Sequence, residues 1–322
     1  MVVQSQPCQA QAQCTPPSYK KVVDIVQEQF TTPPYVTITH AVSQVVQMDE
    51  VLASHSPDRS WNGNYVHGQT VFAHAAVVPS YHASPRPLTA PVPRPTNIIA
   101  APRSINIVLL ERYIPPTSIQ DVKNFFTFCR RSYIVDRLFE LSAHNGSLLL
   151  VYPTRNGALT LTNKYLGPII EPFLRKFVLL SDLNTDVAIS MSQMAAVCGM
   201  RDFAGLEKDV LALCRAIGEH LPSHDPKSRY EVIHTDKANV VLDRAAWKEW
   251  YLEQEQPRLR QALIDYHKSG GRMPARRGQV EVTPDMLVRE VVEAIRQSED
   301  DSGNAAVEVG VFVIRRSVST HA

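Results

Sequence analysis

Residues Ser104–Leu110 read SINIVLL, and residues Ser147–Tyr152 read SLLLVY. Both runs are short, almost wholly apolar and rich in branched side chains, which is typical of strands buried on both faces of a parallel sheet. Between them, Ser118 or Thr117 can cap a long amphipathic helix that ends at Asn145-Gly146. Strand, helix and strand make a βαβ unit, so we expect two parallel strands joined by a right-handed crossover.

The same alternation continues towards the C-terminus. Apolar spacing predicts helices over 159–166, 169–180 and 203–221, and strands over 230–234, 240–242 and 307–314. Asp243 can cap an aromatic helix over 243–268 that Pro257 should kink or divide, and Pro284 suits the first turn of a helix over 285–297. The fold class predicted for 104–318 is therefore α/β: a Rossmann-like, mostly parallel sheet flanked by helices.

Residues 1–103 differ sharply from the rest in charge and proline content. They hold 6 basic and 5 acidic side chains, whereas residues 104–322 hold 27 of each. Seven prolines fall between Pro79 and Pro102, and each removes a donor and favours an extended chain. We predict two domains: a low-charge, Pro/Gln/His-containing arm over 1–103, mostly disordered with local helices at 18–30 and 41–53 and a linker at 79–103, and the α/β domain over 104–318.

Charge and cysteine content exclude several classes of protein. The formal net charge is +1, with 33 basic and 32 acidic side chains, so binding to nucleic acid through bulk charge is not expected. The sequence has no long apolar run and no secretory pattern, and its five cysteines form no CxxC pair. These features favour free thiols, no metal site, no membrane association, and a cytoplasmic or nuclear location.

The best pocket candidate is the loop that follows SLLLVY. Thr154, Arg155, Asn156 and Gly157 stand at the carboxyl end of a predicted strand, where open α/β sheets bind ligands. A hydroxyl, a guanidinium and a glycine at that place suit a cofactor. The alternative is a plain strand-to-helix turn in which Thr154 caps a helix and Arg155 is solvated.

Two further features suggest partners. Arg272, Arg276 and Arg277 form a basic cluster in a Gly/Pro-containing loop, which could serve nuclear import or phosphate contact, or be a solvated loop. A protein partner is expected through the arm at 1–103 or the aromatic helix at 243–268, whose aromatic side otherwise packs on the sheet.

The order of these elements over 104–318 resembles the second half of the class I S-adenosylmethionine methyltransferase fold, in which a strand like SLLLVY follows a helix ending in glycine and two terminal strands close the sheet. The resemblance implies S-adenosylmethionine as cofactor. However, the 13 glycines form no GxG pair, and no P-loop, GxSxG or HExxH motif occurs, so no catalytic residue is assigned.

The sequence therefore leaves three functions open. The first is a non-catalytic accessory or regulatory protein, without cofactor, built on a degenerate nucleotide-binding-like domain. The alternative is an S-adenosylmethionine-dependent methyltransferase with an atypical cofactor loop. The second alternative is a nucleic-acid-associated regulator. Whether the protein is an enzyme is left open.

Overall fold

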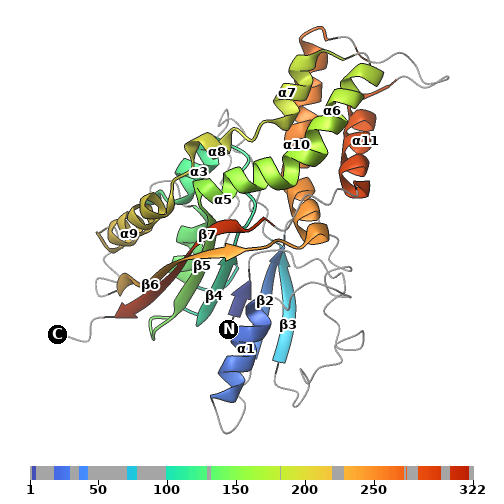
Figure 1. The fold of residues 1–322 in the computed structure, drawn as a ribbon. Coiled ribbons are helices and arrows are strands. Elements are labelled where there is room, and N and C mark those ends of the chain that lie inside the picture. The colour runs from blue at the N-terminus through green and yellow to red at the C-terminus, as the bar shows by residue number, and fades with distance from the viewer. Residues whose placement is uncertain are drawn as a thin grey trace.

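The structure is a computed structural model, and it describes residues 2–4, 18–29, 36–42, 71–77, 99–128, 132–181, 183–219, 228–271, 273, 282–298 and 305–318. Seven strands within these residues form one sheet (Figure 1). They are β1 (Val2–Gln4), β2 (Val36–Val42), β3 (Val71–Val77), β4 (Ile107–Glu111), β5 (Ser147–Pro153), β6 (Ser228–Val240) and β7 (Val307–Val318). Their order is β3-β2-β1-β4-β5-β7-β6.

The sheet is mostly parallel, as predicted. Strands β3, β2, β1, β4 and β5 pair in parallel, whereas β7 runs antiparallel to both β5 and β6. The two strands from which the fold was predicted lie side by side, with Val108 opposite Leu148 and Leu110 opposite Leu150. The four side chains lie on one face of the sheet and are at most 1% exposed, as expected for a face that is covered by helices.

Helices cover both faces of the sheet. Alternation along the strands puts Leu148, Leu150 and Phe312 on one face, where Phe312 stacks on Phe203 of helix α9 (Phe203–Glu219) with ring centroids 5.9 Å apart. The opposite face receives helix α1 (Ser18–Glu28), whose Val23 is 1% exposed and packs in a cluster with Leu109. Two more helices follow β4, namely α3 (Ile119–Phe125) and α4 (Tyr133–Glu140). The single long helix predicted here is thus two shorter ones, because Ser118 caps α3 and Ser132 caps α4.

The N-terminal third belongs to the same sheet. The predicted boundary at 103/104 falls inside it, since β1, β2 and β3 come from residues 1–103 and β1 pairs with β4. The helix predicted at 18–30 is confirmed as α1. The helix predicted at 41–53 is wrong at its start, where residues 41 and 42 end β2; residues 43–53 and 79–98 lie outside the described residues.

A second group of helices stands over one edge of the sheet, and we call it the cap. It consists of α6 (Gly167–Ser181), α7 (Thr185–Ser192), α10 (Arg244–Lys268) and α11 (Pro284–Gln297) (Figure 1). The first two follow β5, through α5 (Arg155–Thr160) and a π-helical turn at Leu161–Leu166, and the last two lie between β6 and β7. The short α8 (Ala196–Gly199) leads from the cap to α9.

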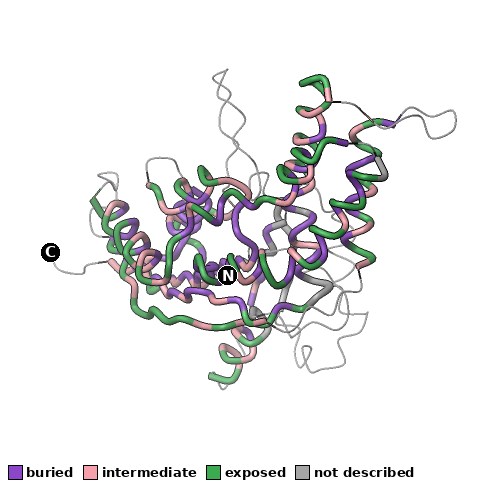
Figure 2. Tube along the Cα trace, turned by 45° about the horizontal axis from the view of Figure 1, so that its top comes forward, coloured by how far each residue is buried: buried purple, intermediate pink, exposed green. Residues whose placement is uncertain are grey.

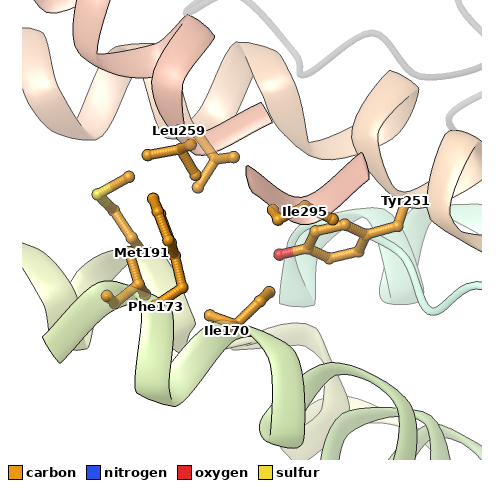
Figure 3. Close-up of a pocket in the computed structure, with 8 residues that line it drawn as sticks. Ile170, Phe173, Met191, Tyr251, Leu259 and Ile295 are labelled. Atoms are coloured by element: carbon orange, nitrogen blue, oxygen red, sulfur yellow. The ribbon is translucent and has the colours of Figure 1, made fainter. Parts of the chain in front are cut away.

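The cap has an apolar interior of its own. Figure 2 shows buried residues on the sides of its helices that face one another. Side chains from all four helices meet there and leave no room for a water molecule between them: Ile170, Phe173, Leu174, Met191, Tyr251, Leu259, Val291 and Ile295 (Figure 3). The aromatic helix predicted at 243–268 is α10, and it continues through Pro257. Trp247 and Tyr251 are at most 2% exposed, so these two aromatic side chains pack within the chain rather than on a partner.

Candidate functional site

The carboxyl ends of β4 and β5 bring two polar side chains together. The Arg112 N–H donates to the Val151 carbonyl at 2.9 Å, which extends the β4–β5 pairing by one step. Glu111 lies opposite Val151, so Arg112 and Tyr152 are the next neighbours across the two strands and point to the same face. In open α/β sheets ligands bind beyond this end of the strands, which makes the Arg112–Tyr152 pair the centre of the candidate site.

The Arg112 guanidinium is almost buried and has no acid beside it. The side chain is 9% exposed, its Nε donates to the Ile114 carbonyl at 3.0 Å, and its Nη2 donates to Gln254 Oε1 at 2.7 Å. Its Nη1 makes no hydrogen bond within the described part of the chain, where no carboxylate pairs with this arginine either. Nη1 is not among the fully buried unpaired atoms, so it keeps some contact with solvent.

Tyr152 is fully enclosed at this edge. It is 0% exposed, and its hydroxyl has no hydrogen-bond partner. Phe125 of α3 stacks on its ring with centroids 5.0 Å apart, and Phe126 meets it edge-on at 5.2 Å. Burial raises the pKa of Tyr152 to about 12, while the charge of Arg112 lowers it and that of Asp121 raises it. The hydroxyl is therefore protonated at neutral pH and available as a donor.

Helix α10 of the cap fixes the turn that follows β4. Gln254 Nε2 donates to the Pro115 carbonyl at 2.6 Å, and Thr117 Oγ1 donates to Glu255 Oε1 at 2.9 Å. Glu255 is 1% exposed and pairs with Arg258 at 2.5 Å, so its charge is balanced. The position of Arg112 is thus set jointly by the sheet edge and the cap.

An aromatic pair closes the opposite side of the same turn. Tyr113 stacks on Trp250 of α10, with ring centroids 5.7 Å apart and planes inclined by 19°. The Tyr113 hydroxyl donates to Glu111 Oε1 at 3.3 Å. Burial, and then the charge of Glu111, raise the pKa of this tyrosine well above its ordinary value. The turn after β4 therefore carries an aromatic pair in addition to Arg112.

The loop predicted as a cofactor pocket packs against β7. Thr154 is 0% exposed, caps α5 by accepting from the Gly157 N–H at 3.1 Å, and donates to Glu308 Oε1 at 2.7 Å. Arg155 and Asn156 are exposed, and Asn156 donates to the same Glu308 oxygen at 3.4 Å. A Cβ on Gly157 would come within 2.0 Å of the Glu308 carbonyl. Thr154 therefore caps a helix, as the alternative interpretation of this loop predicted. A cofactor role for Arg155 and its neighbours stays a prediction.

The remaining predicted sites are not joined to this edge. Arg272, Arg276 and Arg277 lie outside the described residues. Within the described ranges no group of three or more His, Cys, Asp or Glu side chains is placed to hold a metal ion. Among the helices of those same ranges, none combines the length and the apolar character needed to cross a membrane.

Sequence reasoning missed Arg112, Tyr152 and Gln254. The available signal was the carboxyl end of the first predicted strand, where Glu-Arg-Tyr follows SINIVLL just as Thr-Arg-Asn nearly follows SLLLVY. Both strand ends meet at one edge, so the arginine after the first strand was as good a candidate as the arginine after the second.

No protein-family model matches the sequence, and no curated protein matches it. Among solved structures, the chain is similar to loganic acid methyltransferase with S-adenosylhomocysteine, at 10% identity and a TM-score of 0.48 over 100% of this chain and 86% of that one. It is also similar to a Haemonchus contortus phosphoethanolamine N-methyltransferase in complex with S-adenosylhomocysteine (10% identity, TM-score 0.34, 99% of this chain and 49% of that one). A third is the plantazolicin methyltransferase BamL (8% identity, TM-score 0.31, 97% and 76%).

The fold is class I S-adenosylmethionine methyltransferase-like, as the sequence resemblance implied. The strand order itself carries this assignment. The last two strands of the chain, β6 and β7, close the sheet, and the antiparallel β7 lies between β5 and β6. The prediction of a protein without cofactor is contradicted by the similar structures: loganic acid methyltransferase and the Haemonchus contortus methyltransferase both hold S-adenosylhomocysteine. At these identities the similarity concerns the fold, and both the non-catalytic accessory protein and its methyltransferase alternative stay predictions.

Proposed function

We propose that the protein is an S-adenosylmethionine-dependent methyltransferase whose methyl acceptor binds between the sheet edge and the cap. One observation carries this proposal. The sheet has the order β3-β2-β1-β4-β5-β7-β6 with a reversed β7, and two separate insertions bring helices over the carboxyl ends of β4 and β5. Such an arrangement encloses the place where α/β sheets bind ligands.

The cofactor loop that the fold usually carries does not fit this chain. Strand β1 ends at Gln4 and is followed by Ser5-Gln6-Pro7, and the first glycine of the sequence is Gly63. The close backbone approach that a glycine pair allows is thus missing after β1. The cofactor would be held by other groups, and we derive no transfer step through it.

The described residues do supply the surroundings for a methyl acceptor. Phe125 and Phe126 exclude water from the hydroxyl of Tyr152. The stacked Tyr113 and Trp250 rings add apolar surface at the turn after β4. Excluding water strengthens each polar contact made inside the site. Gln254 holds the Arg112 side chain in one orientation, so a bound molecule would meet a preorganised donor.

Isothermal titration calorimetry with S-adenosylmethionine and S-adenosylhomocysteine tests the proposal. We expect dissociation constants on the order of micromolar, and methyl transfer from labelled cofactor to a suitable acceptor. The variant Arg155→Ala separates the predicted loop from the rest of the edge: lost binding would assign the loop to the cofactor, and retained binding would place the cofactor elsewhere. Absence of any binding at millimolar cofactor would overturn the proposed function.

A further inference from the structure

Arg112 and Tyr152 are neighbours across the ends of β4 and β5, and each leaves one hydrogen-bond donor without a partner in the protein. Arg112 carries a full positive charge at 9% exposure without an acid beside it, and its Nη1 has no acceptor. The Tyr152 hydroxyl is fully buried and also lacks a partner. A buried unpaired hydroxyl costs free energy, and beside it lies a guanidinium nitrogen that has no protein acceptor and keeps some contact with solvent, so the two together can accept an anion from solvent.

Other buried arginines in the described part of the chain make different contacts. Arg137 pairs with Glu140 at 2.6 Å. Arg316 donates through Nη1 to the carbonyls of Leu141 and Phe139, and through Nε and Nη2 to Ser228 Oγ. Arg112 differs from both because it lies at the carboxyl end of the strands and its Nη1 keeps some contact with solvent.

We propose that Arg112 and Tyr152 bind a singly charged oxyanion, a carboxylate or a phosphodiester, on the molecule that the protein recognises. The identification of that molecule as the methyl acceptor rests on the proposed function. Nη1 of Arg112 and Oη of Tyr152 each donate to an anionic oxygen, and the guanidinium balances its charge.

The charges around the pair favour one negative charge over two. Arg112 is the cation beside Tyr152, and Asp121 in the first turn of α3 acts on the same hydroxyl with the opposite sign. Asp121 would repel a dianion more strongly than a monoanion, and Arg112 offers only one positive charge to balance it. Phe125 and Phe126 pack on Tyr152, so an apolar or aromatic body attached to the anion matches the walls of the site.

Binding of small probe anions to the full chain, without cofactor, tests this site. Benzoate represents the carboxylate, diphenyl phosphate the phosphodiester, and benzamide is a neutral control with the shape of benzoate. We expect calorimetry to show binding of at least one anion and none of benzamide at the same concentrations. Whichever anion binds more tightly identifies the group.

Two tyrosine variants give a matched comparison. Tyr152→Phe removes a hydroxyl that has no partner in the protein, so it should fold normally and weaken anion binding about tenfold. Tyr165→Phe removes a hydroxyl that donates to the Ala305 carbonyl and accepts from the Leu242 N–H, so it should lower the melting temperature and leave anion affinity unchanged. Arg112→Gln should abolish anion binding, with circular dichroism as the check on folding.

Equal affinity of wild type and Tyr152→Phe for the anions would overturn the inference, as would equal binding of benzoate and benzamide or no anion binding at all. The result is separable from the proposed function. Anion binding without any cofactor binding would keep this site and remove the methyltransferase, whereas cofactor binding without anion binding would do the reverse.

Discussion

Replacing Gly157 by alanine tests whether the loop after β5 is packed against β7 or open. The added Cβ would lie 2.0 Å from the Glu308 carbonyl oxygen, whereas ordinary contact begins at 3.4 Å. The obstacle is backbone within β7, so it cannot turn aside as a side chain would. Moving α5 away from β7 also strains two hydrogen bonds that Thr154 donates to Glu308. Its N–H donates to the Glu308 carbonyl at 3.1 Å, and its Oγ1 donates to the Glu308 carboxylate at 2.7 Å.

The expected loss of stability follows from these contacts. Overpacking costs about 1–3 kcal/mol, and two weakened hydrogen bonds add about 1 kcal/mol each, which gives about 3–5 kcal/mol. At about 2–4 °C per kcal/mol, the melting temperature measured by calorimetry should fall by roughly 10 °C. Gly218→Ala is the matched control, because this glycine is exposed in helix α9 with no atom near its Cβ position. Alanine there should be stabilising by about 0.5–1 kcal/mol.

If Gly157→Ala lowered the free energy of unfolding by less than about 1 kcal/mol, the close packing of α5 against β7 would be refuted. It would mean that α5 stands clear of β7, which is the geometry that the sequence suggested for a cofactor pocket at Thr154–Gly157. Alanine is the better helix former, so a drop in stability can come only from the clash and its consequences.

Three further outcomes are expected. Gln254→Leu should lower the free energy of unfolding measured with urea by about 2–4 kcal/mol, because Arg112 Nη2 and the Pro115 carbonyl lose the side chain that bridges them. Its control is Gln261→Leu on the exposed side of α10, which should change stability by less than about 0.5 kcal/mol. The folded-state pKa of Tyr152 is raised from 10.0 to about 12, so its contribution to stability is complete below pH 10 and is lost as pH rises towards 12. The difference in phenolate absorbance between wild type and Tyr152→Phe should therefore develop above pH 10, and a difference that develops near pH 10 in the folded protein would contradict the prediction. Burial raises the pKa of the Cys214 thiol to about 12, so iodoacetamide should label the exposed Cys198 in the native protein and leave Cys214 unlabelled until denaturation, as mass spectrometry would report.

The part of the fold that the sequence predicts well is the part decided by local hydrophobic pattern. SINIVLL and SLLLVY become β4 and β5 because runs of branched side chains fit a strand that is covered on both faces. The helical segment between them then has to cross over the sheet, because the two strands are parallel. Capping residues predict boundaries equally well: Pro284 opens α11, and Thr154 caps α5. These signals need no information from distant residues.

The N-terminal strands are different, since their pairing is decided by tertiary contacts. Residues 36–42 read VTITHAV and 71–77 read VFAHAAV, and alanine and histidine make both runs ambiguous between strand and helix. Low charge and clustered prolines nearby favoured an arm over a sheet. The parallel partners that hold β2 are β1 and β3, and no local rule connects three strands so far apart in sequence.

The candidate site was partly predictable for the same reason. The rule that ligands bind at the carboxyl ends of strands points to the correct edge. It cannot choose between Arg112 and Arg155, because both follow apolar strands. The choice depends on burial, and Arg112 is covered only because α10, about 140 residues later, places Gln254 against it.

This dependence gives the cap a role in recognition rather than only in stability. Gln254 accepts from Arg112 and donates to Pro115, so one side chain of α10 orients the guanidinium and fixes the turn that carries it. The cap thus helps to decide which edge of the guanidinium is left open, while the neighbouring hydroxyl of Tyr152 is positioned by β5 and by the rings of Phe125 and Phe126, outside the cap. A change in how α10 sits on the sheet would rotate one donor and leave the other in place. The distance between the two donors, and with it the anion that fits them, is thus controlled by the segment between β6 and β7.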